Sequence, residues 1–152
     1  MEKVHEKIRK EIKRWLESKN CTVHSEREVP FHIPNRNDRY HLLKHGKLPN
    51  RSNFPEPIYK PSLGKIVLTR LKRGYIRVDL LGYKEKLTRN FVIQISHTSD
   101  LAEEVKKLEK LEWIQTRIVV RTDEVEGNLN GIPIIPHEKF KEWFSENFFS
   151  RN

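Results

Sequence analysis

The sequence predicts an α/β sandwich, with a central mixed β-sheet flanked by helices, formed as a single domain over residues 1–152. Two observations lead to this class. Segments with apolar residues at helical spacing alternate with short runs rich in Val and Ile, in the order α–β–loop–β–β–β–α–β–β–α. The chain also has the length of one domain, which is long enough to bury a real core.

The first 31 residues predict a helix followed by a strand. Charged residues fill one face of segment 3–18, while its apolar residues recur at helical spacing, at Val4, Ile8, Ile12, Trp15 and Leu16. Asn20 ends this helix. Segment 21–31, with the sequence CTVHSEREVPF, is typical of an extended strand, and Pro30 limits its pairing.

Segment 34–64 predicts a long, basic, Pro-rich loop or insertion. Five prolines and two glycines interrupt it, and a short helix fits only near residues 38–45. A loop of this length inside one domain is often functional, although a surface insertion without a function is the alternative.

The middle of the chain predicts three strands. Segments 65–71 and 75–83 form an expected hairpin around a tight turn at residues 72–74, and segment 90–98 follows after a short polar connection. The last third predicts a helix over 100–114, a strand over 116–122, a polar loop, a strand over 131–136 and a helix over 137–149. Since helix 100–114 is long enough for a crossover, strand 116–122 should run parallel to strand 90–98.

The charge is concentrated in the middle of the chain. Residues 35–90 contain 14 basic and 4 acidic side chains, whereas residues 91–152 contain 8 basic and 11 acidic ones. A basic block on an otherwise balanced chain favours a surface for a polyanion, with nucleic acid, most simply DNA, as the partner; a solvated face is the alternative. The candidate nucleic-acid-binding residues are Arg36, Arg39, Lys44, Lys47, Arg51, Lys60, Arg73 and Arg77.

Composition indicates in which compartment the protein is expected. No stretch approaches the ~20 apolar residues of a membrane span, and the charged N-terminus lacks the apolar core of a signal peptide. The single cysteine, Cys21, permits no internal disulfide, so we expect a cytoplasmic protein without a membrane partner. Abundant Lys and Glu are typical of thermophile proteins.

Two polar side chains interrupt apolar strands. Asp79 lies between Val78 and Leu80, and Gln94 lies within the run FVIQI. On alternating strands Asp79 shares a face with Leu81, and Gln94 shares a face with Ser96. If the two strands are neighbours, Asp79 and Gln94 converge; an exposed sheet face is the alternative.

A strand bearing an Asp, a turn, an apolar strand bearing a polar–x–polar triplet and then a helix resembles the core of the PD-(D/E)xK nuclease superfamily. In size and layout the chain is similar to small archaeal Holliday-junction resolvase-like members. The resemblance implies the restriction endonuclease-like fold over roughly residues 1–122, a Mg²⁺ or Mn²⁺ cofactor, DNA as substrate and a possible homodimer. It implies that Asp79, Gln94, Ser96 and Glu28 occupy the catalytic positions, with Asp79, Gln94 and Glu28 (or Glu26) as metal ligands.

The motif departs from the family pattern at the residues that would perform the chemistry. The "PD" pair is Val78-Asp79, and the "(D/E)xK" triplet is Gln94-Ile95-Ser96. An amide brings no negative charge to Mg²⁺, which prefers carboxylate oxygens, and a hydroxyl cannot supply the lysine's positive charge. Each such electrostatic contribution is worth about 10²–10³ in rate. Candidates for a migrated group are His97, Lys106 and Lys107.

Three functions therefore remain open at this stage. The first is a nucleic-acid-binding protein with weak or lost catalysis on a nuclease fold. The second is an active metal-dependent DNA endonuclease or resolvase with a migrated lysine, and the third is a non-catalytic adaptor that binds a protein partner.

Overall fold

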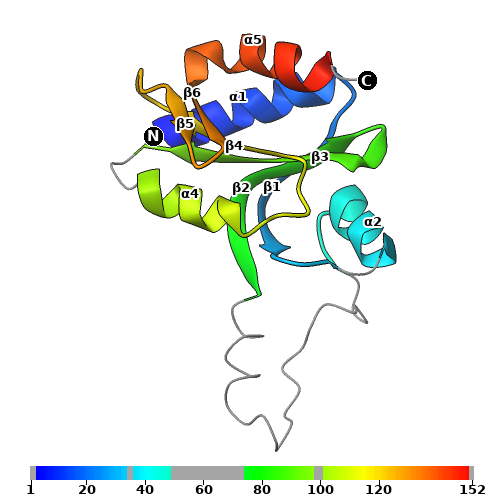
Figure 1. Cartoon of the computed structure of the whole chain (residues 1–152). Helices are drawn as coiled ribbons and strands as arrows, with labels where there is room; N and C mark the ends of the chain where they lie inside the picture. Colours follow the sequence, from blue (N-terminus) through cyan, green and yellow to red (C-terminus); the bar gives the residue numbers. More distant parts are fainter. Residues whose placement is uncertain (1–2, 34–35, 49–73, 98–100, 151–152) are drawn as a thin grey trace, which may run out of the picture.

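The computed structural model describes residues 3–33, 36–48, 74–97 and 101–150. Within them a six-stranded sheet lies between two layers of helices (Figure 1), so the α/β class with a mixed sheet is confirmed. The helical segments are α1 (Val4–Ser18), α2 (Arg36–His45), α4 (Leu101–Glu109), η1 (His137–Lys139), α5 (Phe140–Phe144) and η2 (Ser145–Phe149). The strands are β1 (Thr22–Pro30), β2 (Tyr75–Lys84), β3 (Lys86–Ser96), β4 (Thr116–Arg121), β5 (Gly127–Leu129) and β6 (Ile132–Pro136).

The sheet has the strand order β1-β2-β3-β4-β6-β5. Strands β1, β2 and β3 are antiparallel neighbours, and β5 is antiparallel to β6. Strand β4 is parallel to both β3 and β6. It is parallel to β3 because α4 carries the chain back across the sheet between these two strands. The predicted parallel pairing of the strands near residues 90–98 and 116–122 is therefore confirmed.

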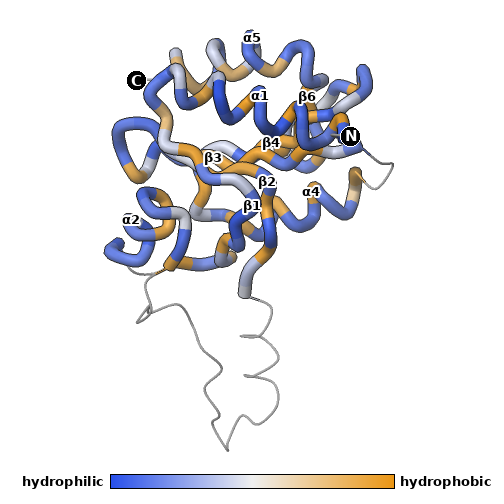
Figure 2. The backbone as a smooth tube through the Cα atoms, turned by 180° about the vertical axis from the view of Figure 1, so that it is seen from behind, coloured by the Kyte–Doolittle hydropathy of each residue, from blue (hydrophilic) through white to orange (hydrophobic). Residues whose placement is uncertain are grey.

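The two faces of the sheet carry separate cores. Helix α1 and the C-terminal segment α5–η2 cover one face, while α2 and α4 cover the other (Figure 1). The first core includes Leu16, Phe91 and Phe144, and the second includes Leu43, Val92 and Leu108. Figure 2 shows the same layers from behind, with many of the hydrophobic residues in the central strands. Cys21 is buried in the first core, and this burial raises the pKa of its thiol to about 11.

Several boundaries differ from the sequence prediction. The helix expected over 100–114 ends at Glu109, and tight turns then bury Leu111 and Ile114 without continuing the helix. Strand β3 begins at Lys86 rather than near residue 90, and forms a tight hairpin with β2 around Glu85, whose φ is 66°. The expected polar loop contains the short strand β5, and the last helix opens with the 3₁₀ turn η1 and ends in the π turn η2.

Part of the predicted Pro-rich loop is helical, since α2 covers Arg36–His45. The predicted strand 65–71, the turn at 72–73 and the rest of the loop from residue 49 lie outside the described residues. In the described part of the chain, no helix is both long and apolar enough to cross a membrane.

The end of α2 is held tightly against β1. The side chain of His24 on β1 lies 2.9 Å from the carbonyl oxygen of Leu43. Gly46 follows with φ +79°, and a Cβ there would lie 2.8 Å from Nδ1 of His24 and 3.0 Å from Nε of Arg27. Burial lowers the pKa of His24, so its imidazole stays neutral at pH 7 and suits this contact.

We expect Gly46→Ala to reduce the free energy of unfolding by about 2 kcal/mol, from left-handed backbone strain plus the contact with His24. Gly131→Ala is the matched control, because Gly131 has φ +85° with open space around it. It should lose only the strain contribution, about 1 kcal/mol. Urea unfolding of both variants measures the difference, and equal losses would show that the close approach at Gly46 contributes nothing.

Candidate functional site

Strands β1 and β2 bend together at Glu26 and Asp79. Val23 packs in the core under α1 while Val29 packs in the core under α2 and α4, so the inward face of β1 changes between them. The inward face of β2 changes as well: Val78 packs in the second core and Leu80 packs in the first. The order is reversed relative to β1 because the two strands are antiparallel. Glu26 has φ 53°, a conformation that breaks regular strand alternation. The expected shared face of Asp79 and Leu81 is therefore wrong, because Leu81 packs under α2 and α4.

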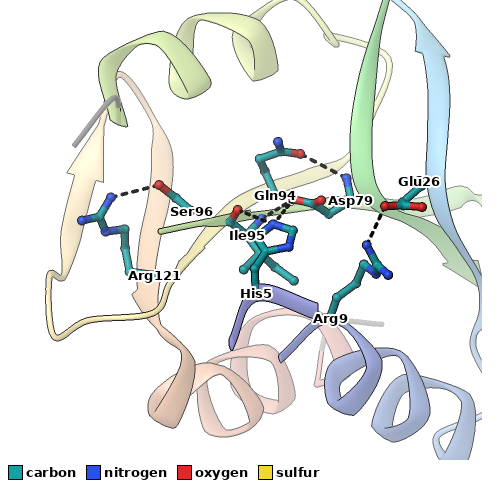
Figure 3. A network of polar contacts seen from close by, with 8 residues as sticks. All are labelled: His5, Arg9, Glu26, Asp79, Gln94, Ile95, Ser96 and Arg121. Carbon is teal, nitrogen blue, oxygen red and sulfur yellow. Dashed lines mark hydrogen bonds and ion pairs between the residues drawn. The ribbon is translucent and has the colours of Figure 1, made fainter. Parts of the chain in front are cut away.

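Beyond the bend, the backbones of β2 and β3 are no longer paired, and we call the opening between them the fork. Side chains bridge it. The backbone pairing of these strands extends only to Leu80 and Ile93. Beyond it, the Asp79 N–H donates to Oε1 of Gln94 at 3.1 Å, and the Ile95 N–H donates to Oδ2 of Asp79 at 2.8 Å (Figure 3). The structure thus brings Asp79 and Gln94 together. Both side chains take the place of strand partners for backbone groups that would otherwise be unpaired.

Helix α1 adds a histidine to the fork. Nε2 of His5 lies 3.1 Å from the carbonyl oxygen of Ile95 and 3.4 Å from Oδ2 of Asp79. The same carboxylate oxygen therefore faces both a backbone N–H and an imidazole nitrogen (Figure 3). The Asp79 side chain is only 13% exposed, so these contacts hold it within the fold.

Ser96, the last residue of the Gln94-Ile95-Ser96 triplet, is joined to an arginine. Nη1 of Arg121 donates to the buried Ser96 hydroxyl at 2.9 Å. Asp123 binds the rest of this guanidinium, at 3.1 Å from Nε and 2.6 Å from Nη2. Hydrogen bonding by Arg121 lowers the pKa of Asp123 to about 2, so this carboxylate is ionised at neutral pH. Arg121 is already paired with Asp123, and its guanidinium cannot serve as a proton acceptor.

Helix α4 contributes Glu104 to the same region. Oε2 of Glu104 is buried and has no hydrogen-bond partner among the described residues. Burial raises the pKa of Glu104, and the charge of Asp79 raises it further, while the Ser96 hydroxyl and the Arg121 charge oppose the shift. Glu104 therefore belongs to one polar cluster with Asp79, Ser96 and Arg121.

The two candidate acids of β1 take different places. Glu26 lies at the level of Asp79, since Ser25 pairs with Leu80 and Arg27 with Val78. Its carboxylate lies 2.7 Å from Nη1 of Arg9 and 3.6 Å from Nη2 of Arg77. Glu28 is exposed and pairs with Arg77 in the strand register, farther along β1 than the fork.

Of the predicted substitutes for the missing lysine, Lys107 acts on the cluster through its charge, whereas no recorded contact among the described residues joins His97 or Lys106 to it. His97 is exposed directly after β3, and its Nδ1 lies 2.9 Å from the Thr122 hydroxyl. Lys106 and Lys107 are exposed on α4, and Lys107 lies near enough to Glu104 to lower the pKa of that carboxyl slightly.

The candidate nucleic-acid-binding residues divide into three groups. Arg36, Lys44, Lys47 and Arg77 are exposed. Arg39 is instead used by the fold, because its guanidinium lies 5.5 Å from the Trp113 ring and donates to the Ile33 carbonyl at 3.4 Å. Arg51, Lys60 and Arg73 lie outside the described residues.

The described residues contain no group of three or more His, Cys, Asp or Glu side chains placed to hold a metal ion. Asp79, Gln94 and Glu28, the predicted ligands, fit Mg²⁺ or Mn²⁺ poorly for a local reason. Oδ2 of Asp79 and Oε1 of Gln94 already accept backbone N–H groups, and Glu28 stands beyond the fork.

Sequence reasoning missed His5, Glu104 and Arg121. One signal was available for Glu104, which falls in the apolar stripe of Leu101, Val105 and Leu108 at helical spacing. A carboxylate in such a stripe faces the sheet rather than solvent. Arg121 likewise ends the apolar run IVV of β4.

No family model, curated protein or solved structure matches this chain.

Proposed function

We propose that this chain is a nucleic-acid-binding protein built on the restriction endonuclease-like plan, in which the former catalytic centre has become a structural polar cluster with weak or lost catalysis. The element order supports the plan. Helix α1, strand β1, the β2–β3 hairpin, helix α4 and strand β4 follow one another as in the PD-(D/E)xK resemblance, with α1 and α4 on opposite faces of the sheet.

One observation carries the loss of catalysis. The groups at the motif positions are bonded to one another or to neighbouring protein groups: Asp79 to Ile95, Gln94 to Asp79, and Ser96 to Arg121. A metal ion for phosphodiester hydrolysis would find here the Oδ1 atom of Asp79, an uncharged amide and a hydroxyl bonded to Arg121, in place of the two carboxylates and the lysine of the family motif. An arginine held by Asp123 neither binds a metal ion nor accepts a proton.

The basic block supports the binding part of the proposal. Among its described members, the exposed Arg36, Lys44, Lys47 and Arg77 lie on α2, directly after it, or on the adjoining part of β2. Phosphate contacts by Lys and Arg supply most non-specific nucleic-acid affinity and require no base recognition. DNA is the partner that we propose first, and an RNA or an acidic protein is an alternative outcome of the test.

Glu104 favours a second candidate, an active metal-dependent endonuclease. It brings a second carboxylate toward Asp79 from a helix rather than from the motif strand, and one of its oxygens has no hydrogen-bond partner in the described residues. In that case Glu104 replaces the acid that Gln94 no longer provides.

The test is binding and cleavage of one labelled panel: duplex, single strand, splayed arm and four-way junction DNA, with Mg²⁺, Mn²⁺ or chelator. We expect gel shifts in every buffer, no cutting, and no effect of Asp79→Asn or Glu104→Gln on binding. Lys47→Ala and Arg77→Ala should each reduce the slope of log K against log salt by about 1. Lys141→Ala, on the exposed side of α5, is the matched control and should leave the slope unchanged.

Two outcomes contradict the proposal. Metal-dependent cutting that disappears in Asp79→Asn or Glu104→Gln would establish the endonuclease. No shift with any DNA at about 150 mM salt, where non-specific binders still reach about 10⁻⁴–10⁻⁶ M, would exclude DNA binding. Repeating the shifts with RNA of the same forms would then separate an RNA binder from a protein adaptor.

A further inference from the structure

A pocket of about 430 Å³ lies where the end of α2 meets the C-terminal end of β1 and the N-terminal end of β2. It lies beyond the fork, on the side of the bend that carries Glu28 and Arg77. Its volume falls within the range of small-molecule sites, and both apolar and charged side chains line it.

The apolar part of the lining includes one aromatic ring. Tyr75 begins β2, is 46% exposed and pairs with Pro30 of β1, while Leu48 approaches from the chain after α2. A half-exposed tyrosine beside a proline and a leucine provides a surface on which a planar ring stacks.

The charged part of the lining favours an anion. Arg27, Lys47 and Arg77 stand against two acids, Glu26 and Glu28. Glu26 has Arg9, which lies outside the lining, as its nearest cation at 2.7 Å. Arg77 lies 3.6 Å from the same carboxylate. When Arg9 is counted with the three cations of the lining, four positive charges stand against the two acids.

One part of the pocket wall, at the end of α2, is fixed before any ligand arrives. Gly46 packs directly on His24 and on Nε of Arg27, and His24 is hydrogen-bonded to Leu43 at the end of α2. These contacts fix the backbone at the end of α2 against β1, so this part of the wall requires little ordering on binding.

We infer that this pocket receives an unpaired nucleotide, with its base stacked on Tyr75 and its phosphate held by Arg27, Lys47 and Arg77. The Glu28 carboxylate then accepts a hydrogen bond from a base amino group, as carboxylates do with the amino group of cytosine. This inference rests on the proposed function and deepens it. It assigns to the same protein a preference for DNA with an extruded or unpaired base.

The experiment compares three labelled duplexes of one sequence: fully paired, with a single-cytosine bulge, and with an abasic site in place of the bulged base. Fluorescence anisotropy measures each affinity. We expect the bulged duplex to bind about tenfold more tightly than the other two, as stacking of one base on an aromatic ring allows. Tyr75→Ala should abolish the preference and leave paired-duplex affinity unchanged, whereas Tyr75→Phe should retain it.

Glu28→Gln tests the base contact with a fourth duplex that carries a bulged thymine. It should reduce the preference for the bulged cytosine and leave that for the bulged thymine unchanged. Lys141→Ala should leave all affinities unchanged, and thermal melts should show that every variant is folded. Equal affinity of the wild type for the three duplexes, or a bulge preference that survives in Tyr75→Ala, overturns the inference while duplex binding sustains the proposed function. Binding to none of the duplexes overturns both.

Discussion

Arg121→Ala is expected to reduce the free energy of unfolding by about 3 kcal/mol, because it removes the hydrogen bond to the buried Ser96 hydroxyl and the charge-assisted hydrogen bonds to Asp123. The side chain of Arg121 is 8% exposed and bonds both Ser96 and Asp123. Its charge also opposes the raised pKa of Glu104. Urea unfolding at pH 7 measures the loss.

A second substitution tests the reason for this loss. Without Arg121, the Glu104 carboxylate faces Asp79 with less compensation, so Glu104→Gln should recover part of the stability in the Arg121→Ala background. Because the pKa of Glu104 is raised in the folded protein, its ionisation lowers stability as pH rises from its ordinary value of 4.5 through the folded value. The recovery should therefore be larger at pH 7 than at pH 4. Recovery of equal size at both pH values would contradict a charge effect.

Phe144→Ala is expected to destabilise the protein by about 4 kcal/mol, the cost of removing a fully buried aromatic ring and leaving a cavity. The Phe144 ring is at the centre of an aromatic cluster. It stacks on Phe148 at 4.6 Å between centroids and on Phe140 at 5.1 Å, and it meets Phe91 edge-on at 5.3 Å. The cluster holds the C-terminal segment α5–η2 on the sheet.

Glu142→Ala is the matched control on the same helix, because Glu142 is exposed and alanine suits a helix. Its stability should change by no more than about 0.5 kcal/mol. Thermal and urea unfolding of both variants, followed by far-UV circular dichroism, measure the difference. A loss below about 1.5 kcal/mol for Phe144→Ala would mean that the aromatic cluster contributes little beyond ordinary burial.

Local periodicity was sufficient for much of the fold. Helix α1, the central strands and the C-terminal helical segment each show a strong apolar pattern, and the crossover through α4 makes β4 parallel to β3. The pattern failed where tertiary contacts decide the backbone. Leu111 and Ile114 continue the helical spacing of α4, yet they are buried in turns, where the indole of Trp113 donates to the Pro30 carbonyl. Strand β5 carries no apolar alternation and exists because β6 offers it a backbone edge.

Part of the candidate site also followed from sequence. Asp79 and Gln94 are polar residues in apolar strands, and their meeting required only that β2 and β3 be neighbours. The bend at Glu26 and Asp79 decided that the Asp79 and Gln94 side chains accept backbone N–H groups. Glu26 adopts a left-handed conformation without being glycine, so no residue type announced it.

By itself, therefore, the sequence determined the α/β class, the neighbouring strands that carry Asp79 and Gln94, and the basic character of the middle of the chain. Only the tertiary structure decided that side chains close the fork, that Glu104 and Arg121 join them, and that the end of α2 forms a pocket with β1 and β2. The physical reason is distance along the chain. Apolar periodicity is a local property, whereas hydrogen bonds such as that between Ser96 and Arg121 join residues that only the completed fold brings together.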